Sequence, residues 1–318
     1  MQEMDVISEE NSFVERLIRV HNHINDYISL LQERIRTEGN ILISKEWVDL
    51  LYNDKIDLAQ GKTVVPKIKH TSLLWDVLSG QITALRLACE LGMPFQYLQQ
   101  NEGEVVARIY PKKGFEQTNS GYNMKALGWH TDDSILTREF RAHWIALFGF
   151  SNPHDVPTYI SRLDKILNVL SLQYIKILSQ PLYCLKMPTS FGNQDIWSAP
   201  TPLMYLQQNT DLMEIAVATY HAQPADVNNK KAKEALNALI CAAEHVKEEI
   251  ILKPGDWIIF NNNRVLHSRG EIQHQERLIF RTYIRPNLHA LIKRTGDKGY
   301  VFNLEKLIDN YNNNLIIH

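Results

Sequence analysis

A histidine and a carboxylate stand two residues apart in the stretch GWHTDDS, residues 128–134. In an extended strand the side chains at i and i+2 lie on one face, so His130 and Asp132 would present an imidazole and a carboxylate together. The same spacing arises by chance in a chain with twelve histidines, where it is more often a solvated turn. The pair alone is thus only a candidate for half of a metal site. A third ligand elsewhere in the chain is needed to support it.

A candidate third ligand is His267, in the stretch KPGDWIIFNNNRVLHSRG, residues 253–270. Two histidines and one carboxylate occupy one face of an octahedral iron ion and leave three positions open for a chelating co-substrate and dioxygen. Zinc held by the same three ligands would instead serve a hydrolase. A non-catalytic barrel that binds a small acid without metal is the other alternative.

Two arginines follow ten residues later in the run RLIFR, where Arg277 and Arg281 are four positions apart on an apolar strand and therefore share a face. Guanidinium groups that point into a barrel are costly unless anions meet them there. One such anion would be the distal carboxylate of 2-oxoglutarate, which a planar guanidinium can bind through two hydrogen bonds. The alternative is an edge strand with solvated arginines.

The elements that must position these residues follow from the apolar spacing of a chain with 44% hydrophobic and 22% charged residues. Helical spacing appears first and short strand-like runs rich in β-branched and aromatic residues follow. The expected helices are 12–36, 72–91, 161–180 and 228–249, and the expected strands lie within 105–111, 142–150, 248–262, 264–270 and 276–286. Helices followed by strands with helical insertions predict one α+β domain over residues 1–318.

Charge and hydropathy restrict the partners. The formal net charge is −2 and no long basic run occurs, so we expect a small-molecule substrate and no nucleic acid. The N-terminus MQEMDVISEENS lacks a signal-peptide pattern, and no window reaches the ~18 apolar residues needed to span a bilayer. We therefore expect a cytoplasmic protein without a membrane partner. Helix 12–36 could form a homo-oligomer contact, although covering its own barrel is favoured.

From about Gly103 to Pro286 the order of these segments resembles the Fe(II)/2-oxoglutarate-dependent oxygenases of the taurine dioxygenase and clavaminate synthase-like superfamily. The run FEQTNSG ahead of WHTDD is most similar to the branch that hydroxylates free amino acids. The resemblance implies a double-stranded β-helix (jelly-roll) core over about 103–286 with flanking helices. A helical part over about 1–100 would precede the core, and a C-terminal extension over 287–318 would follow it.

The resemblance also implies roles for matched positions. His130, Asp132 and His267 would ligate Fe(II), whereas many members of this branch have glutamate where this chain has Asp132. Thr158 and Arg277 would bind 2-oxoglutarate, and Arg281 would face the carboxylate of the substrate. The loop between His267 and Arg277 is shorter than usual in this branch, so Arg281 could be the co-substrate residue instead.

The implied reaction consumes 2-oxoglutarate and O2, yields succinate and CO2, and hydroxylates an unactivated C–H bond. Asp132 fills the position that related halogenases leave to chloride, so hydroxylation is predicted. Asp133 could pair with an amine or guanidinium, and Gln117 and Asn119 could contact an amino-acid headgroup, although solvated or turn roles fit these three residues equally well. The expected substrate is a free polar or basic L-amino acid such as lysine or arginine, with a carrier-bound aminoacyl group or another small acid as the alternative.

Overall fold

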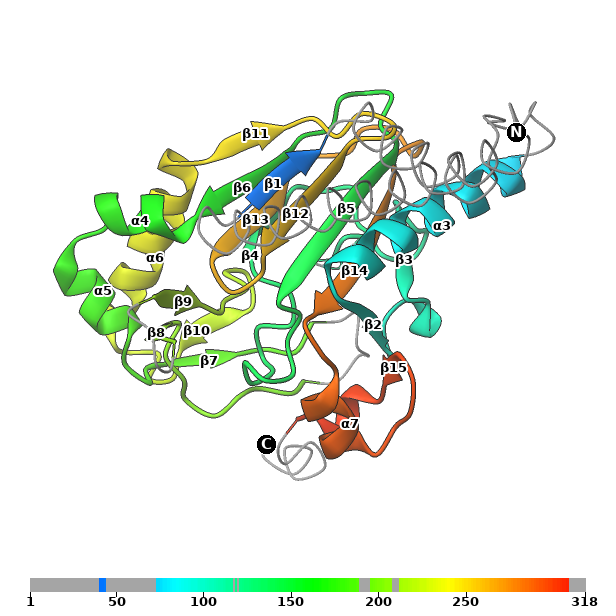
Figure 1. Ribbon diagram of the computed structural model, residues 1–318. Coiled ribbons are helices and arrows are strands. Elements are labelled where there is room, and N and C mark those ends of the chain that lie inside the picture. The colour runs from blue at the N-terminus through cyan, green and yellow to red at the C-terminus, as the bar shows by residue number, and fades with distance from the viewer. Residues whose placement is uncertain are drawn as a thin grey trace, which may run out of the picture.

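Two β-sheets lie face to face between layers of helices in the computed structural model (Figure 1). The structure describes residues 40–43, 73–116, 118, 120–188, 195–207 and 212–308. The predicted α+β class is confirmed. The predicted helix 12–36 lies outside the described residues.

The larger sheet has seven strands, ordered β1-β12-β5-β14-β2-β15, with β3 also paired to β14. All its pairs are antiparallel except β15 with β2. Its strands are β1 (Asn40–Ile43), β2 (Met93–Tyr97), β3 (Val106–Ile109), β5 (Trp144–Ser151), β12 (Trp257–Asn261), β14 (Leu278–Arg285) and β15 (Val301–Phe302).

The smaller sheet has four antiparallel strands in the order β11-β6-β13-β4. They are β4 (Leu127–His130), β6 (Thr158–Arg162), β11 (Glu248–Ile250) and β13 (Val265–Arg269). Two further ribbons pair β7 (Tyr183–Leu185) with β10 (Ala222–Pro224) and β8 (Met204–Leu206) with β9 (Met213–Ile215).

Strand alternation decides which side chains lie between the two sheets. Ile279 and Tyr283 of β14 belong to the central core together with Ile160 of β6. Phe280, one position on from Ile279, belongs instead to a second core on the outer face of the larger sheet. Arg281 lies between Ile279 and Tyr283 in the same alternation, so the sequence directs its guanidinium inward.

Helix α3 (Leu73–Leu91) packs on the outer face of the larger sheet (Figure 1). A Cβ atom on Gly80 would lie 2.6 Å from a ring carbon of Phe280, so glycine permits the close approach of helix and strand. The helix ends at Gly92, where a Cβ atom would lie 2.5 Å from the carbonyl oxygen of Arg285. The predicted helix 72–91 is thus confirmed.

Three helices cover the outer face of the smaller sheet: α4 (Leu163–Val169), α5 (Leu172–Leu178) and α6 (Lys230–His245). The single helical run predicted for 161–180 is two helices. Leu170 leaves the helical conformation with ψ 132°, and the Ser171 side chain accepts a hydrogen bond from the Tyr174 N–H to start a new helix. The Asn229 side chain caps α6 in the same way, accepting from the Ala232 N–H over 3.0 Å.

The two ends of the described chain add strands that the sequence did not predict. β1 extends one edge of the larger sheet by pairing with β12, so the first ~100 residues are not helical throughout. The C-terminal extension contains α7 (His289–Thr295), and its β15 pairs parallel with β2. Among the described helices, none has the length and apolar character to cross a membrane.

Candidate metal centre

Strand pairing brings the two predicted histidine ligands together. β13 runs antiparallel to β4, and His267 stands directly opposite His130. Their neighbours Leu266 and Trp129 turn outward into the core beneath α4 to α6, so both imidazoles point between the sheets. The ring centroids are 4.0 Å apart.

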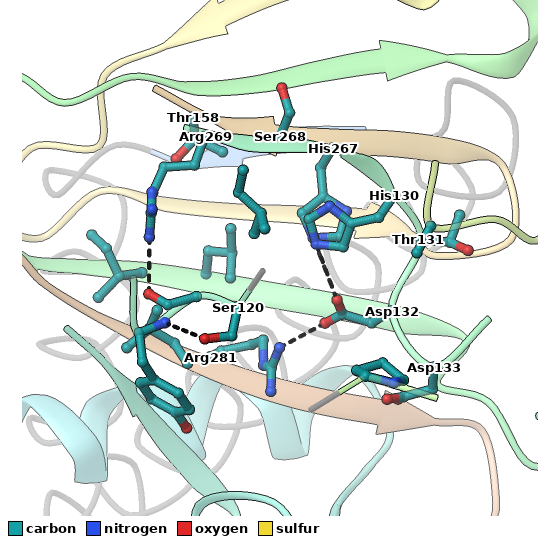
Figure 2. A pocket seen from close by; sticks show the side chains of 18 of the residues that line it. Ser120, His130, Thr131, Asp132, Asp133, Thr158, His267, Ser268, Arg269 and Arg281 are labelled. Carbon is teal, nitrogen blue, oxygen red and sulfur yellow. Dashed lines mark hydrogen bonds and ion pairs between the residues drawn. The ribbon is translucent and has the colours of Figure 1, made fainter. Parts of the chain in front are cut away.

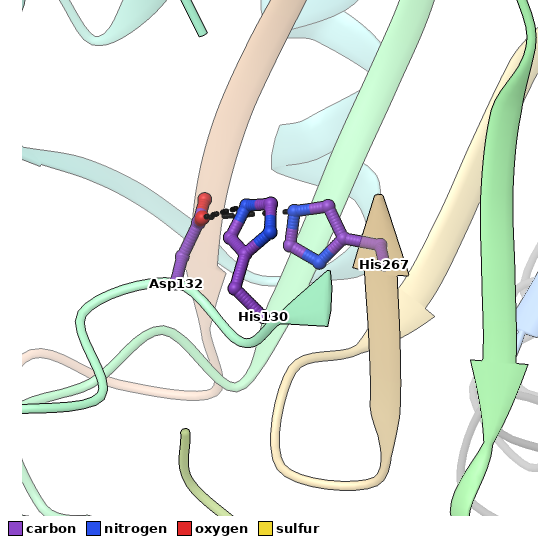
Figure 3. A group of neighbouring side chains, drawn as sticks. All are labelled: His130, Asp132 and His267. Carbon is purple, nitrogen blue, oxygen red and sulfur yellow. Dashed lines mark ion pairs between the residues drawn. The ribbon is translucent and has the colours of Figure 1, made fainter. Parts of the chain in front are cut away.

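The carboxylate of Asp132 completes the group from the turn that follows β4 (Figure 3). Its Oδ1 lies 3.4 Å from Nε2 of His130 and 3.6 Å from Nε2 of His267. These separations are long for hydrogen bonds. Two donors that each bind one metal ion at about 2.1 Å stand roughly 3.0 to 3.4 Å apart, so the three atoms fit a shared ion.

The protonation states also suit a metal ligand set. Nδ1 of His130 lies 2.9 Å from the carbonyl oxygen of Gly128, which can only accept, so Nδ1 donates and Nε2 is the nitrogen left for a metal. Burial, together with the neighbouring His130, lowers the pKa of His267 to about 3. Burial opposes ionisation of Asp132, but Arg281 and the two histidines hold its pKa below the ordinary value. Neutral imidazoles and an ionised carboxylate are the forms that bind metal.

Asn262, which follows β12, positions Asp132 by its backbone. Its Oδ1 accepts from the Asp132 N–H over 2.8 Å, and its Nδ2 donates to the carbonyl oxygens of Asp132 and Ala142 over 3.0 and 3.3 Å. The side chain is fully buried. Sequence reasoning missed this residue, although the run of three asparagines at 261–263 was an available signal.

Arg277 lies at the start of β14 as a buried cation without an acidic partner among the described residues. It is 4% exposed, and Nη2 lies 3.5 Å from Oγ1 of Thr158. Burial, with the charge of Arg269, lowers its pKa to about 9, so the guanidinium is still charged at neutral pH. A buried charge without a counter-ion is strongly unfavourable, and a ligand carboxylate would relieve that cost.

Arg281 enters the same pocket but has a different partner. Nη1 donates to Oδ2 of Asp132 over 2.9 Å (Figure 2). Nη2 donates to Oε1 of Gln100 over 3.3 Å. Its Nε is buried without a hydrogen-bond partner. The structure thus places Arg281 against the predicted metal ligand, with a donor left for another acceptor.

Asp133 also lines the pocket, in a left-handed backbone conformation with φ 57°. Its Oδ1 accepts from Nε2 of Gln100 over 3.2 Å, and its Oδ2 has no partner. Burial and the charge of Asp132 raise its pKa to about 8, so the carboxyl is neutral near pH 7. Gln117 and Asn119 lie outside the described residues.

Several pocket residues were not predicted from the sequence. Arg269 donates to the carbonyl oxygens of Gly121, Asn123 and Lys125 and so fixes the segment that closes one side of the pocket. Gln100 bridges Arg281 and Asp133. Three tyrosines complete the lining: Tyr122, Tyr220 and Tyr283.

The chain matches a model of the taurine catabolism dioxygenase TauD, TfdA family over residues 79–283. This range contains all three members of the metal-ligand group and both arginines.

Individual relatives are distant. An enduracididine β-hydroxylase of Streptomyces hygroscopicus is 25% identical over 235 residues, which cover 67% of each chain. An L-ornithine/L-arginine 3-hydroxylase of Catenulispora acidiphila is 24% identical over 242 residues, covering 67% of this chain and 69% of the relative. A solved structure of an asparagine oxygenase with Fe(II), 2S,3S-3-hydroxyasparagine and succinate superposes with TM-score 0.71 at 21% identity, covering 89% of this chain and 85% of the other. That likeness places the fold among the jelly-roll oxygenases.

Proposed function

This chain belongs to the TauD/TfdA family and is an Fe(II)- and 2-oxoglutarate-dependent oxygenase, and from that premise we propose that it hydroxylates a free polar or basic L-amino acid. Family membership decides against the zinc hydrolase and the non-catalytic barrel. The two hydroxylases and the oxygenase named above carry amino acids in their names, which supports the substrate class.

His130, Asp132 and His267 hold the iron. Fe(II) and 2-oxoglutarate, when bound, would supply the oxidation of a C–H bond to C–OH by O2, with one oxygen atom going to the hydroxyl group and the other to succinate, and with CO2 released. The protein contributes two imidazoles, an ionised carboxylate and an interior position that keeps bulk water away.

Two arginines with free donors correspond to two carboxylates. Within the part of the chain that the structure describes, Arg277 has Thr158 beside it and no acid, so we assign it to the distal carboxylate of 2-oxoglutarate. Arg281 already donates a hydrogen bond to the metal ligand Asp132. Its Nε has no hydrogen-bond partner and can donate to the carboxylate of the substrate. We therefore propose Arg277, rather than Arg281, as the co-substrate residue.

The contact between Arg281 and Asp132 is the observation that carries the proposal. A substrate carboxylate bound to Arg281 would lie next to the residue that contacts the metal ligand Asp132. The carbons beside that carboxylate would therefore be nearest to the oxidation site. We therefore propose attack close to the amino-acid headgroup rather than at the end of a long side chain.

Asp133 provides the complementary charge for the amino group. Asp133 and Arg281 line the same pocket, and Oδ2 of Asp133 has no hydrogen-bond partner. A bound ammonium would favour the ionised form of Asp133. A substrate with neighbouring carboxylate and ammonium groups would satisfy both residues, as a free amino acid does.

The test is succinate formation from 2-oxoglutarate with Fe(II), ascorbate and air across the twenty L-amino acids and L-ornithine. We expect one or a few polar or basic amino acids to stimulate turnover, and their α-amides, which lack the carboxylate, to fail. Asp132→Ala is the inactive control, and the exposed His245→Ala is the matched active control. Stimulation by no free amino acid, with background turnover that only Asp132→Ala abolishes, would overturn the free-amino-acid proposal in favour of a carrier-bound substrate.

A further inference from the structure

Two loops outside the pocket lie side by side and carry a second group of metal-binding side chains. The first, residues 152–157, joins β5 to β6, and the second, residues 270–277, joins β13 to β14. Their bases are joined where the Gly270 N–H donates to the Pro157 carbonyl over 3.0 Å. A Cβ atom on residue 270 would lie 2.8 Å from Cγ of Pro157, so glycine allows this close approach.

Hydrogen bonds to buried groups hold the backbone of each loop in place. The Asn152 side chain is 4% exposed; it accepts from the Val156 N–H over 3.0 Å and donates to the carbonyl oxygens of Val156 and Leu252. In the other loop Ile272 is buried, and its N–H donates to the Met124 carbonyl over 2.7 Å. The backbone of each loop is therefore anchored, which fixes the position of the loop tips.

The tips bring together His154 from the first loop and His274 and Glu276 from the second. The imidazole rings stack with centroids 3.9 Å apart and planes 27° apart. Nε2 of His154 lies 3.5 Å from Oε2 of Glu276, and one ligand atom from each of the three residues lies within 4.8 Å of the others. The nitrogen-to-oxygen separation is long for a hydrogen bond but close to the about 3.3 Å between two donors on one tetrahedral zinc ion.

We propose that His154, His274 and Glu276 form a second metal site, which binds a transition-metal ion such as Zn²⁺ and is separate from the iron site. Two imidazoles and one carboxylate are a donor set that suits zinc, with solvent as the fourth ligand. All three side chains are exposed, so the site is open to solution and needs no rearrangement of the core.

An ion at this position would join two loops that lead directly into the pocket. Thr158 follows the first loop, and Arg277 ends the second. The ion would therefore clamp the two segments that carry the residues assigned to the distal carboxylate of 2-oxoglutarate, although the site itself does not depend on that assignment.

The test is the number of zinc ions bound by the full chain after removal of metal, measured by equilibrium dialysis and metal analysis. We expect two for the unmodified protein, because the iron ligands also accept zinc, and one for His154→Ala/His274→Ala. Asp132→Ala should retain one, and the combined variant none. His289→Ala, which removes an exposed histidine elsewhere, should still bind two.

A second readout is independent of stoichiometry. In the Asp132→Ala background zinc should slow amide hydrogen exchange in residues 152–157 and 270–277, and the double histidine replacement should abolish that protection. Equal zinc binding by the unmodified protein and His154→Ala/His274→Ala would overturn the proposal. Because those two residues are exposed, this comparison remains decisive even if Asp132→Ala fails to fold.

Discussion

Arg281 donates from Nη1 to Oδ2 of Asp132 over 2.9 Å, on the side of the carboxylate away from the oxygen that faces His130 and His267. One carboxylate thus faces the metal position with one oxygen and a pocket arginine with the other. If Arg281 binds the substrate carboxylate as proposed, this single side chain connects metal binding with substrate binding.

Replacement of Arg281 should therefore impair both functions. For Arg281→Gln we expect metal affinity to fall by roughly 10- to 100-fold, as for other groups that orient a ligand, and the KM for the amino acid to rise. The KM for 2-oxoglutarate should change little. Cobalt titration and steady-state kinetics measure these effects. The variant Arg281→Lys keeps the positive charge but lacks the planar guanidinium group, so it tests the effect of charge alone. A selective rise in the KM for 2-oxoglutarate would instead identify Arg281 as the co-substrate residue.

Replacement of Arg277 should separate activity from stability. Arg277→Gln removes a buried cation that has no acidic partner among the described residues. Without ligands, the free energy of unfolding should therefore stay the same or rise, whereas a typical point substitution lowers it by about 1 kcal/mol. The KM for 2-oxoglutarate should rise roughly 10- to 100-fold, because charge-assisted hydrogen bonds are lost.

Denaturant unfolding and 2-oxoglutarate kinetics measure the two effects of Arg277→Gln. Arg86→Gln is the matched control, because Arg86 is an exposed arginine paired to Glu90 and should leave the KM unchanged. Lower stability of Arg277→Gln with an unchanged KM would contradict the assignment.

Asn262 should act on the metal through the backbone of Asp132. Asn262→Ala leaves the Asp132 N–H and C=O without their buried partners, so we expect a loss of about 1 to 3 kcal/mol in stability and roughly 10-fold weaker metal binding. Asn261→Ala is the control, since the Asn261 side chain accepts from the Asn263 N–H and, among the described residues, makes no hydrogen bond to Asp132. Normal metal affinity in Asn262→Ala would exclude this positioning role.

The sequence predicted the metal ligands and the two arginines from their spacing and order along the chain. Strand alternation accounts for the inward direction of Arg281, which lies between Ile279 and Tyr283. Asn262 and Gln100 could not be found in this way, since each contacts the site from a segment whose position depends on tertiary packing. The two-residue strand β15 is too short for any period to appear, and its partner β2 lies about 200 residues earlier.

His143, which precedes β5, predicts a pH dependence of stability outside the site. Burial, together with Arg285, Arg138 and Arg141, lowers its pKa to about 3 in the folded protein, against about 6.5 in the unfolded chain. Between these values the unfolded state binds the extra proton, so stability is retained above pH 6.5 and lost as the pH falls toward 3.

His143→Gln should remove this contribution to the pH dependence. Urea unfolding at pH 7 and pH 5.5 should show a smaller loss of stability for the variant, with a difference of up to about 1.4 kcal/mol per pH unit. The exposed His289→Ala is the control and should follow the unmodified protein. Identical pH slopes for His143→Gln and the unmodified protein would show that His143 takes up its proton in the folded state.

The most direct measurement is the fate of isotopically labelled dioxygen during turnover with the stimulating amino acid. We expect one labelled atom in succinate and one in a hydroxylated amino acid, with the two products formed in equal amounts and both absent with Asp132→Ala. An amino acid consumed without gaining label, or succinate formed without a matching hydroxylated product, would contradict the proposal that this pocket hydroxylates a free amino acid.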